Sequence, residues 1–135
     1  MLPFKPTTQE EESGCAVACI ASLLGISYKK SKKLVGKDYN VLVGMYAKGI
    51  VKVLKKVGLN YEYKKVTPKT KKYLNQIGSI IFIKRSKRFI RGHYLIKTEK
   101  GFMDPWINNP YMNPAKAGFE KKLPGIPQWI IYKNL

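Results

Sequence analysis

The chain has 135 residues, of which 44% are hydrophobic and 25% are charged. This composition excludes an intrinsically disordered chain, and we expect residues 1–135 to form a single globular domain. Lys and Arg number 26 against 8 Asp and Glu, a formal net charge of +18. The charge predicts attraction to nucleic acid or another polyanion, with solubility as the competing interpretation.

The first part of the chain predicts helices. Residues 14–24 are apolar almost throughout, which is typical of a buried helix, and Gly25 can end it in a left-handed conformation. Ser27 is a suitable N-cap for a short basic helix that ends at Gly36. Residues 45–57 repeat apolar side chains at helical spacing and precede another glycine.

The second part predicts strands, with one short helix that begins at Thr67 and runs to about residue 76. A long loop is expected over residues 107–127, because this segment is rich in Pro, Asn and Gly. Because helices come first and antiparallel strands follow, the predicted fold class is α+β, with N-terminal helices packed on an antiparallel sheet. Alternating or β-branched and aromatic residues predict strands over residues 59–66, 79–85, 89–97 and 128–133, and a further strand is expected around residues 102–106.

No targeting or membrane segment is predicted. The N-terminal segment has no apolar core flanked by basic residues, and the longest apolar run, residues 15–26, is too short to span a bilayer. We therefore expect a cytoplasmic protein, with a virion-associated protein or a delivered effector as alternatives. The sequence does not predict an oligomeric state.

Cys15 lies where the first predicted helix begins, directly after Gly14. A helix N-terminus stabilises a thiolate, so the pKa of a cysteine there can fall below the ordinary value of about 8.5. Cys15 is therefore a candidate nucleophile, whereas Cys19, one turn further on, is expected to be buried and unreactive. We interpret the three glutamates at residues 10–12 as a solvated loop favourable to the helix N-terminus.

His93 is the one histidine of the chain, and Asp104 follows it in the next predicted strand. If the hairpin between them has an even-numbered loop, Leu95 lies opposite Asp104, and His93 becomes a diagonal neighbour of Asp104 on the same face. An odd-numbered loop would separate the two. His93 is therefore the candidate base, and Asp104 the candidate acceptor that orients it.

Two further hypotheses concern the surroundings of Cys15. The backbone N–H of Cys15 and the side-chain amide of Gln9 are candidate donors to an oxyanion. Alternatively, Cys15 and Cys19 could bind a metal together with His93 or Asp104, although no second Cys or His pair supports such a site. Ordinary packing roles are the competing interpretation for each of these residues.

Gln9 precedes Cys15 by six residues, and a helix of small apolar residues follows. This spacing resembles the bacteriocin-processing, or double-glycine, peptidase family of the papain-like clan. The sequences His-Tyr-Leu-Ile at residues 93–96 and Asp-Pro at residues 104–105 are similar to the later signature of that family. The resemblance extends from Gln9 to about Trp106.

The resemblance implies a papain-like fold with Cys15 as nucleophile, His93 as base, Asp104 as the orienting residue and Gln9 in the oxyanion hole. The family usually has an acidic residue before the cysteine and a glycine after it. Here Gly14 precedes the cysteine, and we interpret it as a source of backbone freedom at the start of the helix.

Together these features predict a cysteine peptidase that cleaves a polypeptide substrate through a Cys-His-Asp triad and a thioester intermediate, without a cofactor or metal. Two alternatives stay open. One is a basic nucleic-acid-binding protein or toxin-like ribonuclease on the same scaffold, and the other is a cysteine-dependent deamidase.

Overall fold

A computed structural model describes residues 4–133, so the outermost residues of the predicted domain, 1–3 and 134–135, lie outside the described part. The helices are α1 (Cys15–Leu24), α2 (Tyr28–Val35) and α3 (Ala47–Lys56), with 3-10 helices η1 (Gly36–Asp38) and η2 (Lys71–Asn75). The strands are β1 (Tyr61–Lys65), β2 (Ile80–Ile83), β3 (His93–Thr98), β4 (Gly101–Asp104), β5 (Gly118–Glu120) and β6 (Pro127–Lys133).

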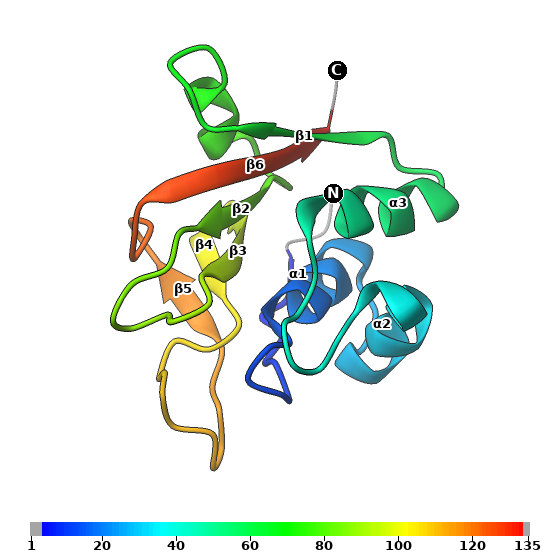
Figure 1. The fold of residues 1–135 in the computed structure, drawn as a ribbon, viewed down its shortest axis with the longest axis vertical. Helices are drawn as coiled ribbons and strands as arrows, with labels where there is room; N and C mark the ends of the chain where they lie inside the picture. The colour runs from blue at the N-terminus through cyan, green and yellow to red at the C-terminus, as the bar shows by residue number, and fades with distance from the viewer. Residues whose placement is uncertain (1–3, 134–135) are drawn as a thin grey trace.

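The strands form one antiparallel sheet in the order β1-β6-β2-β3-β4-β5. The three α-helices lie together on one side of this sheet (Figure 1). One core cluster joins the helices to alternate residues of the strands, and a second cluster lies on the other set of strand positions. The predicted α+β class, with N-terminal helices packed on an antiparallel sheet, is confirmed.

The helix ends follow the sequence closely. Gly25 ends α1 in the left-handed region, with φ of 69°. The hydroxyl oxygen of Ser27 accepts a hydrogen bond from the N–H of Lys30 and caps α2. Helix α1 is buried along nearly its whole length, as its apolar sequence predicts, and it packs against β3. This packing fixes the start of α1 relative to the sheet.

The β3–β4 hairpin has the even-numbered loop on which the predicted His93–Asp104 pairing depends. Thr98 pairs with Gly101 and Lys97 pairs with Phe102, so a two-residue loop joins the strands. The same register, continued along β3, brings the start of that strand toward Asp104 at the end of β4.

Two predicted elements differ from the structure near residues 67–76 and 89–97. The first is a turn followed by η2 rather than an α-helix, because the hydroxyl of Thr70 accepts from the N–H of Thr67 at 2.8 Å and donates to the carbonyl of Lys65 at 2.7 Å. These local bonds compete with helical pairing. The predicted strand over residues 89–97 begins only at His93, because Gly92, with φ of 78°, turns the chain just before it.

A third difference lies in the segment that we expected to be a long loop, residues 107–127. It contains β5, a three-residue strand that pairs with β4. The chain between β4 and β5 projects from one end of the molecule (Figure 1). The sheet therefore gains an edge strand directly beside Asp104, which pairs with Gly118.

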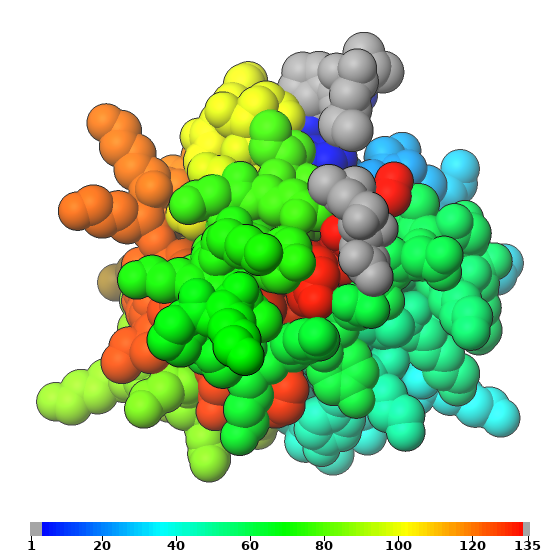
Figure 2. All heavy atoms as spheres, turned by 90° about the horizontal axis from the view of Figure 1, so that it is seen from above, coloured from blue at the N-terminus to red at the C-terminus, as the bar shows by residue number. Residues whose placement is uncertain are grey.

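The surface carries many long side chains that extend away from the body of the molecule (Figure 2). Three of the ion pairs join side chains on this surface, among them Lys52 with Asp38 at 3.6 Å. Among residues 4–133, no helix has the length and apolar character that crossing a membrane would need.

Candidate active site

Cys15 is the first residue of α1, and Gly14 is the N-cap. The N–H groups at the start of a helix have no partner within the helix, so the Cys15 sulfur lies beside unpaired donors and the positive end of the helix dipole. The residue is 9% exposed and borders a small pocket of about 50 Å³, which Met45, Gly92 and Tyr94 also line. A small reagent or a substrate carbonyl can therefore approach the sulfur from this side.

The structure explains the glycine before the cysteine differently from the sequence. Gly14 has φ of −87° and ψ of 14°, which other residues also adopt, so backbone freedom is not the reason for it. A Cβ atom at Gly14 would instead collide with the hydroxyl of Tyr28 and lie 3.3 Å from the carbonyl of Glu11. The glycine leaves room for a tyrosine that packs against the helix start.

A hydrogen-bonded group around Glu11 holds that tyrosine in place. The hydroxyl of Tyr28 donates a very short hydrogen bond to Oε1 of Glu11, and Tyr39 donates to the same oxygen at 3.2 Å. Lys32 donates to Oε2 at 2.8 Å. Burial raises the pKa of Glu11, but the bonds from Lys32 and Tyr28 outweigh it and leave the pKa below its ordinary value.

The expectation of a solvated acidic loop is therefore wrong for Glu11, although Glu10 is exposed. The partners of Glu11 lie 17 to 28 residues away in sequence, so no local pattern shows them. Two residues after Glu11, the hydroxyl of Ser13 donates to the carbonyl of Val41 at 2.6 Å. Long-range side-chain bonds thus fix the segment that leads into Cys15.

Gln9 is also buried, and its side chain turns back onto the same segment. Its Nε2 donates to the carbonyls of Glu11 at 2.8 Å and Glu12 at 3.0 Å. Its backbone N–H donates to the carbonyl of Pro105 at 3.1 Å, which ties the segment to the end of β4. Among the described residues its Oε1 has no hydrogen-bond partner. Both amide hydrogens are therefore occupied in the resting protein.

His93 and Asp104 lie together as the hairpin geometry predicts. His93 Nε2 is 2.6 Å from Oδ1 of Asp104, and both side chains are almost fully buried. The N–H of Trp106 donates to the same oxygen at 2.9 Å. Since Nε2 is taken by Asp104, the other ring nitrogen, Nδ1, is available to a second partner, and the side chain of Cys15 lies close enough to raise the pKa of His93.

The three side chains form one electrostatic unit. Burial alone lowers the pKa of His93, but the hydrogen bond to Asp104 and the nearby side chain of Cys15 outweigh it and raise the pKa to about 9. Burial raises the pKa of Asp104, but the hydrogen bond and charge of His93 outweigh it and leave that pKa below its ordinary value. The environment therefore favours an imidazolium held by a carboxylate.

An aromatic ring covers the imidazole on one side. Phe89 stacks on His93 with ring centroids 4.2 Å apart and an angle of 4° between the planes, and the guanidinium of Arg88 lies 4.8 Å from the centre of the Phe89 ring. Sequence reasoning missed this contact, because residues 89–92 looked like an ordinary continuation of the strand. The stack limits the rotation of the imidazole.

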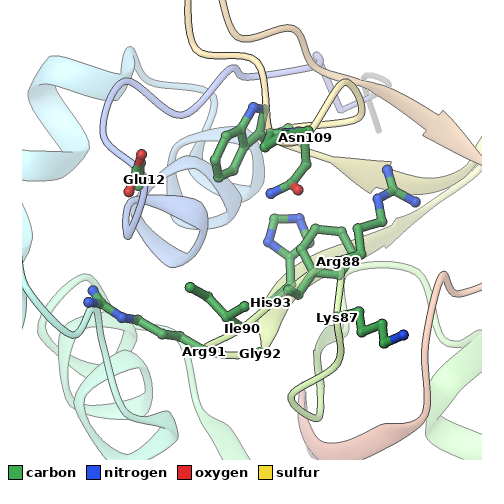
Figure 3. A pocket seen from close by; sticks show the side chains of 11 residues that line it. Glu12, Lys87, Arg88, Ile90, Arg91, Gly92, His93 and Asn109 are labelled. Carbon is green, nitrogen blue, oxygen red and sulfur yellow. The ribbon is translucent and has the colours of Figure 1, made fainter.

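A larger pocket of about 370 Å³ opens beside His93 (Figure 3). Lys87 and Arg88 border it on one side of the imidazole, and Glu12 and Arg91 on the other. The pocket lies next to the imidazole, with three cationic side chains and one carboxylate in its lining.

Cys19 lies inside the protein, as expected. It is fully buried, and this burial is the main cause that raises its pKa well above the ordinary value. Among residues 4–133, no group of three or more His, Cys, Asp or Glu side chains is placed to hold a metal ion. Cys15 is thus the cysteine that borders a pocket.

The model of the peptidase C39 family matches residues 3–122. The chain belongs to the peptidase C39 family. It is therefore a cysteine peptidase, a hydrolase that acts on polypeptides, and the resemblance to double-glycine peptidases is confirmed. The ribonuclease, nucleic-acid-binding and deamidase alternatives receive no support from the comparisons.

A solved structure similar to this C39 peptidase is the peptidase domain of Streptococcus ComA, a bifunctional ABC transporter involved in a quorum-sensing pathway. The two share 18% sequence identity over 97% of this chain and 99% of that chain, with a TM-score of 0.48. No curated protein matches the chain in sequence. The family assignment stands on the match to residues 3–122.

Proposed function

We propose that Cys15, His93 and Asp104 are the catalytic triad of this C39 peptidase, within one domain that spans the chain. The observation that carries the proposal is the buried pair of His93 and Asp104, with 2.6 Å between Nε2 and Oδ1, beside a cysteine at the start of α1 that is close enough to raise the pKa of His93. One domain is supported by β6, the last strand of the described chain, which lies inside the sheet between β1 and β2.

The reaction follows from this arrangement. The Cys15 sulfur attacks the carbonyl carbon of the scissile bond, and an S–C bond forms. The protonated His93 gives its proton to the leaving amine as the C–N bond breaks, which leaves a thioester on Cys15. His93 then takes a proton from water, the resulting hydroxide attacks the thioester, and the carboxylic acid product leaves while the sulfur is restored.

Asp104 has two tasks in this scheme. Its Oδ1 accepts the hydrogen bond from Nε2 of His93 and so keeps the Nδ1 side of the ring toward the sulfur. Its negative charge stabilises the imidazolium, in line with the raised pKa of His93. Asp104 itself stays ionised, because its own pKa is lowered.

The tetrahedral intermediate needs donors for its oxyanion. The backbone N–H of Cys15, at the start of α1, is one. The Nε2 of Gln9 is the second when one of its two bonds, to the carbonyls of Glu11 and Glu12, is exchanged for the oxyanion. On this proposal, Gln9 both ties the loop in the resting enzyme and stabilises the intermediate.

The charge around the site bears on the substrate. The pocket beside His93 has Lys87, Arg88 and Arg91 in its lining against the carboxylate of Glu12. A polypeptide with acidic or neutral residues next to the scissile bond is therefore favoured over a basic one. Since the net charge is +18, the same preference holds for the approach of the substrate.

The test uses a peptide library prepared by digesting a whole proteome with an unrelated protease. The native enzyme should create new N-termini, and Cys15→Ala should lower their yield at least about 1,000-fold while Cys19→Ala, the matched control, retains cleavage. Cleavage that survives in Cys15→Ala would overturn the proposal. Gln or Asn side chains hydrolysed without chain cleavage would show a deamidase instead.

A further inference from the structure

A second carboxyl group lies behind the proposed triad. In the register of β4 and β5, Phe102 pairs with Glu120 and Asp104 pairs with Gly118. Glu120 is two residues from Gly118, so its side chain is a diagonal neighbour of Asp104 on the same face of the sheet. The two carboxyl groups come from adjacent strands.

Both carboxyl groups have a buried oxygen without a hydrogen-bond donor. Within residues 4–133, neither Oδ2 of Asp104 nor Oε2 of Glu120 has a partner, and both atoms are buried. The other oxygen of Asp104, Oδ1, is in contact with His93 and Trp106. A buried oxygen without a donor costs free energy, and two neighbouring carboxylates repel each other. One proton shared between Oδ2 and the Glu120 carboxyl would remove both costs.

Arg88 does not supply the missing donor. Its Nη1 is 3.9 Å from Oε2 of Glu120, within ion-pair distance but too far for a hydrogen bond. Its Nη2 donates to the carbonyl of Ile107 at 2.9 Å. Burial first, and then the charge of Asp104, raise the pKa of Glu120, against the opposing charges of Arg88 and His93.

We propose that Glu120 keeps its proton and donates it in a hydrogen bond to Oδ2 of Asp104, which makes Glu120 a positioning residue for the triad. This proposal rests on the proposed function, in which Asp104 orients His93. With Oδ1 bound to His93 and Oδ2 bound to Glu120, the carboxylate of Asp104 cannot rotate. The hydrogen bond also stabilises the ionised form of Asp104 and makes it a weaker acceptor for the imidazolium proton.

The histidine itself reports on this bond. The chain has one histidine, so the imidazole ¹⁵N signals in a pH titration belong to His93 alone. Glu120→Gln retains a neutral donor, so the midpoint of the His93 titration in this variant should match that in the native protein. Glu120→Ala removes the donor, makes Asp104 more basic, and should raise the His93 midpoint by about 0.5–1 pH unit.

A fall of the His93 midpoint in Glu120→Ala, instead of a rise, would overturn the proposal. If Glu120 were ionised, both variants would remove a negative charge near His93, and both midpoints would fall. An unchanged midpoint in Glu120→Ala would also contradict it. If Glu120→Ala does not fold, the near-isosteric Glu120→Gln decides, because any movement of its midpoint contradicts the proposal.

A matched control lies at the opposite edge of the sheet. Glu62 in β1 is also a strand glutamate, and its Oε2 accepts from the hydroxyl of Tyr132 at 2.9 Å. Glu62→Ala should leave the His93 midpoint unchanged, which separates a local effect from general destabilisation.

A kinetic measurement distinguishes this proposal from the assignment of the nucleophile. Glu120→Ala should lower kcat about tenfold with little change in KM, and Glu120→Gln should restore most of it. The NMR titration is made without substrate. A failure of Cys15 to act as nucleophile would therefore remove the turnover readout and leave the His93 titration interpretable.

Discussion

The two halves of the proposed site are held in place by different means. His93 and Asp104 are at the ends of adjacent strands, and backbone hydrogen bonds along β3 and β4 set their register. Cys15 instead follows a segment without regular structure, residues 9–14. This segment is held by side chains from later in the chain, such as Tyr28 of α2 and Tyr39.

The two halves should therefore respond differently to substitution. A strand pair keeps its geometry when a side chain changes, because the backbone sets the spacing. The segment before Cys15 has no such backbone frame, and its geometry depends on Glu11 and its donors. We therefore expect substitutions in the sheet half to change the chemistry and leave the fold intact, and substitutions in the helix half to move Cys15 itself.

The largest effect is expected in the sheet half. Asp104→Asn keeps the size of the side chain but removes the charge that stabilises the imidazolium of His93. Cleavage of the peptide library, measured as kcat/KM, should fall at least about 100-fold with an unchanged circular dichroism spectrum. Asp38→Asn removes a surface partner of Lys52 and serves as the control with native activity. Native activity in Asp104→Asn would contradict the role of Asp104.

His93, in the sheet half, should make the free energy of unfolding depend on pH. The pKa of His93 is raised to about 9 in the folded protein, against about 6.5 when unfolded, so its charged form stabilises the fold. This stabilisation is fully present below about pH 6.5 and is lost as the pH rises through about 9, and its size is on the order of 3 kcal/mol.

The measurement is urea unfolding of the native protein and of His93→Gln at pH 6 and at pH 9.5. The free energy of unfolding should differ less between the two proteins at pH 9.5 than at pH 6, because the imidazolium no longer contributes at the higher pH. Lysines and tyrosines titrate in both proteins, so their effect cancels when the free energy of unfolding of the variant is subtracted from that of the native protein. A difference that stays constant or grows with pH would contradict the imidazolium at this site.

The helix half is tested by the glycine before Cys15. Gly14→Ala places a Cβ against the hydroxyl of Tyr28, which Glu11 holds in place, so one of the two must move. We expect a loss of about 1–2 kcal/mol in the free energy of unfolding and slower alkylation of Cys15.

Gly49 provides the matched control, because it lies inside α3 and a Cβ there would make ordinary contacts at 3.5 Å or more with Asp38. Gly49→Ala should be neutral or stabilise the protein by up to about 1 kcal/mol. Equal stability and equal Cys15 reactivity in Gly14→Ala and Gly49→Ala would refute the account of the helix start.

Sequence reasoning worked best where the relevant contacts are local. The position of α1 follows from its apolar run and the cap at Gly25, and that of the basic helix α2 follows from its caps at Ser27 and Gly36. The even loop of the β3–β4 hairpin brings His93 to Asp104. The resemblance to the family supplied the same four site residues.

Sequence reasoning failed where contacts join segments that are distant in the chain. Glu11 looked like a solvated loop residue, because its partners Tyr28 and Tyr39 are not visible in local spacing. Glu120 lies in a three-residue strand within a segment rich in Pro and Gly, and no alternation marks it. The stack of Phe89 on His93 depends on the turn at Gly92, which the strand-like sequence concealed.

In the proposed mechanism, the Cys15 sulfur on the helix half is activated by the His93 imidazole on the sheet half. Iodoacetamide alkylation at pH 6, mapped by mass spectrometry in the native protein and in His93→Ala, measures this activation. We expect fast labelling of Cys15 and not of the buried Cys19, and slow labelling of Cys15 in His93→Ala. Labelling of Cys15 that is slow at pH 6, or equally fast with and without His93, would contradict it.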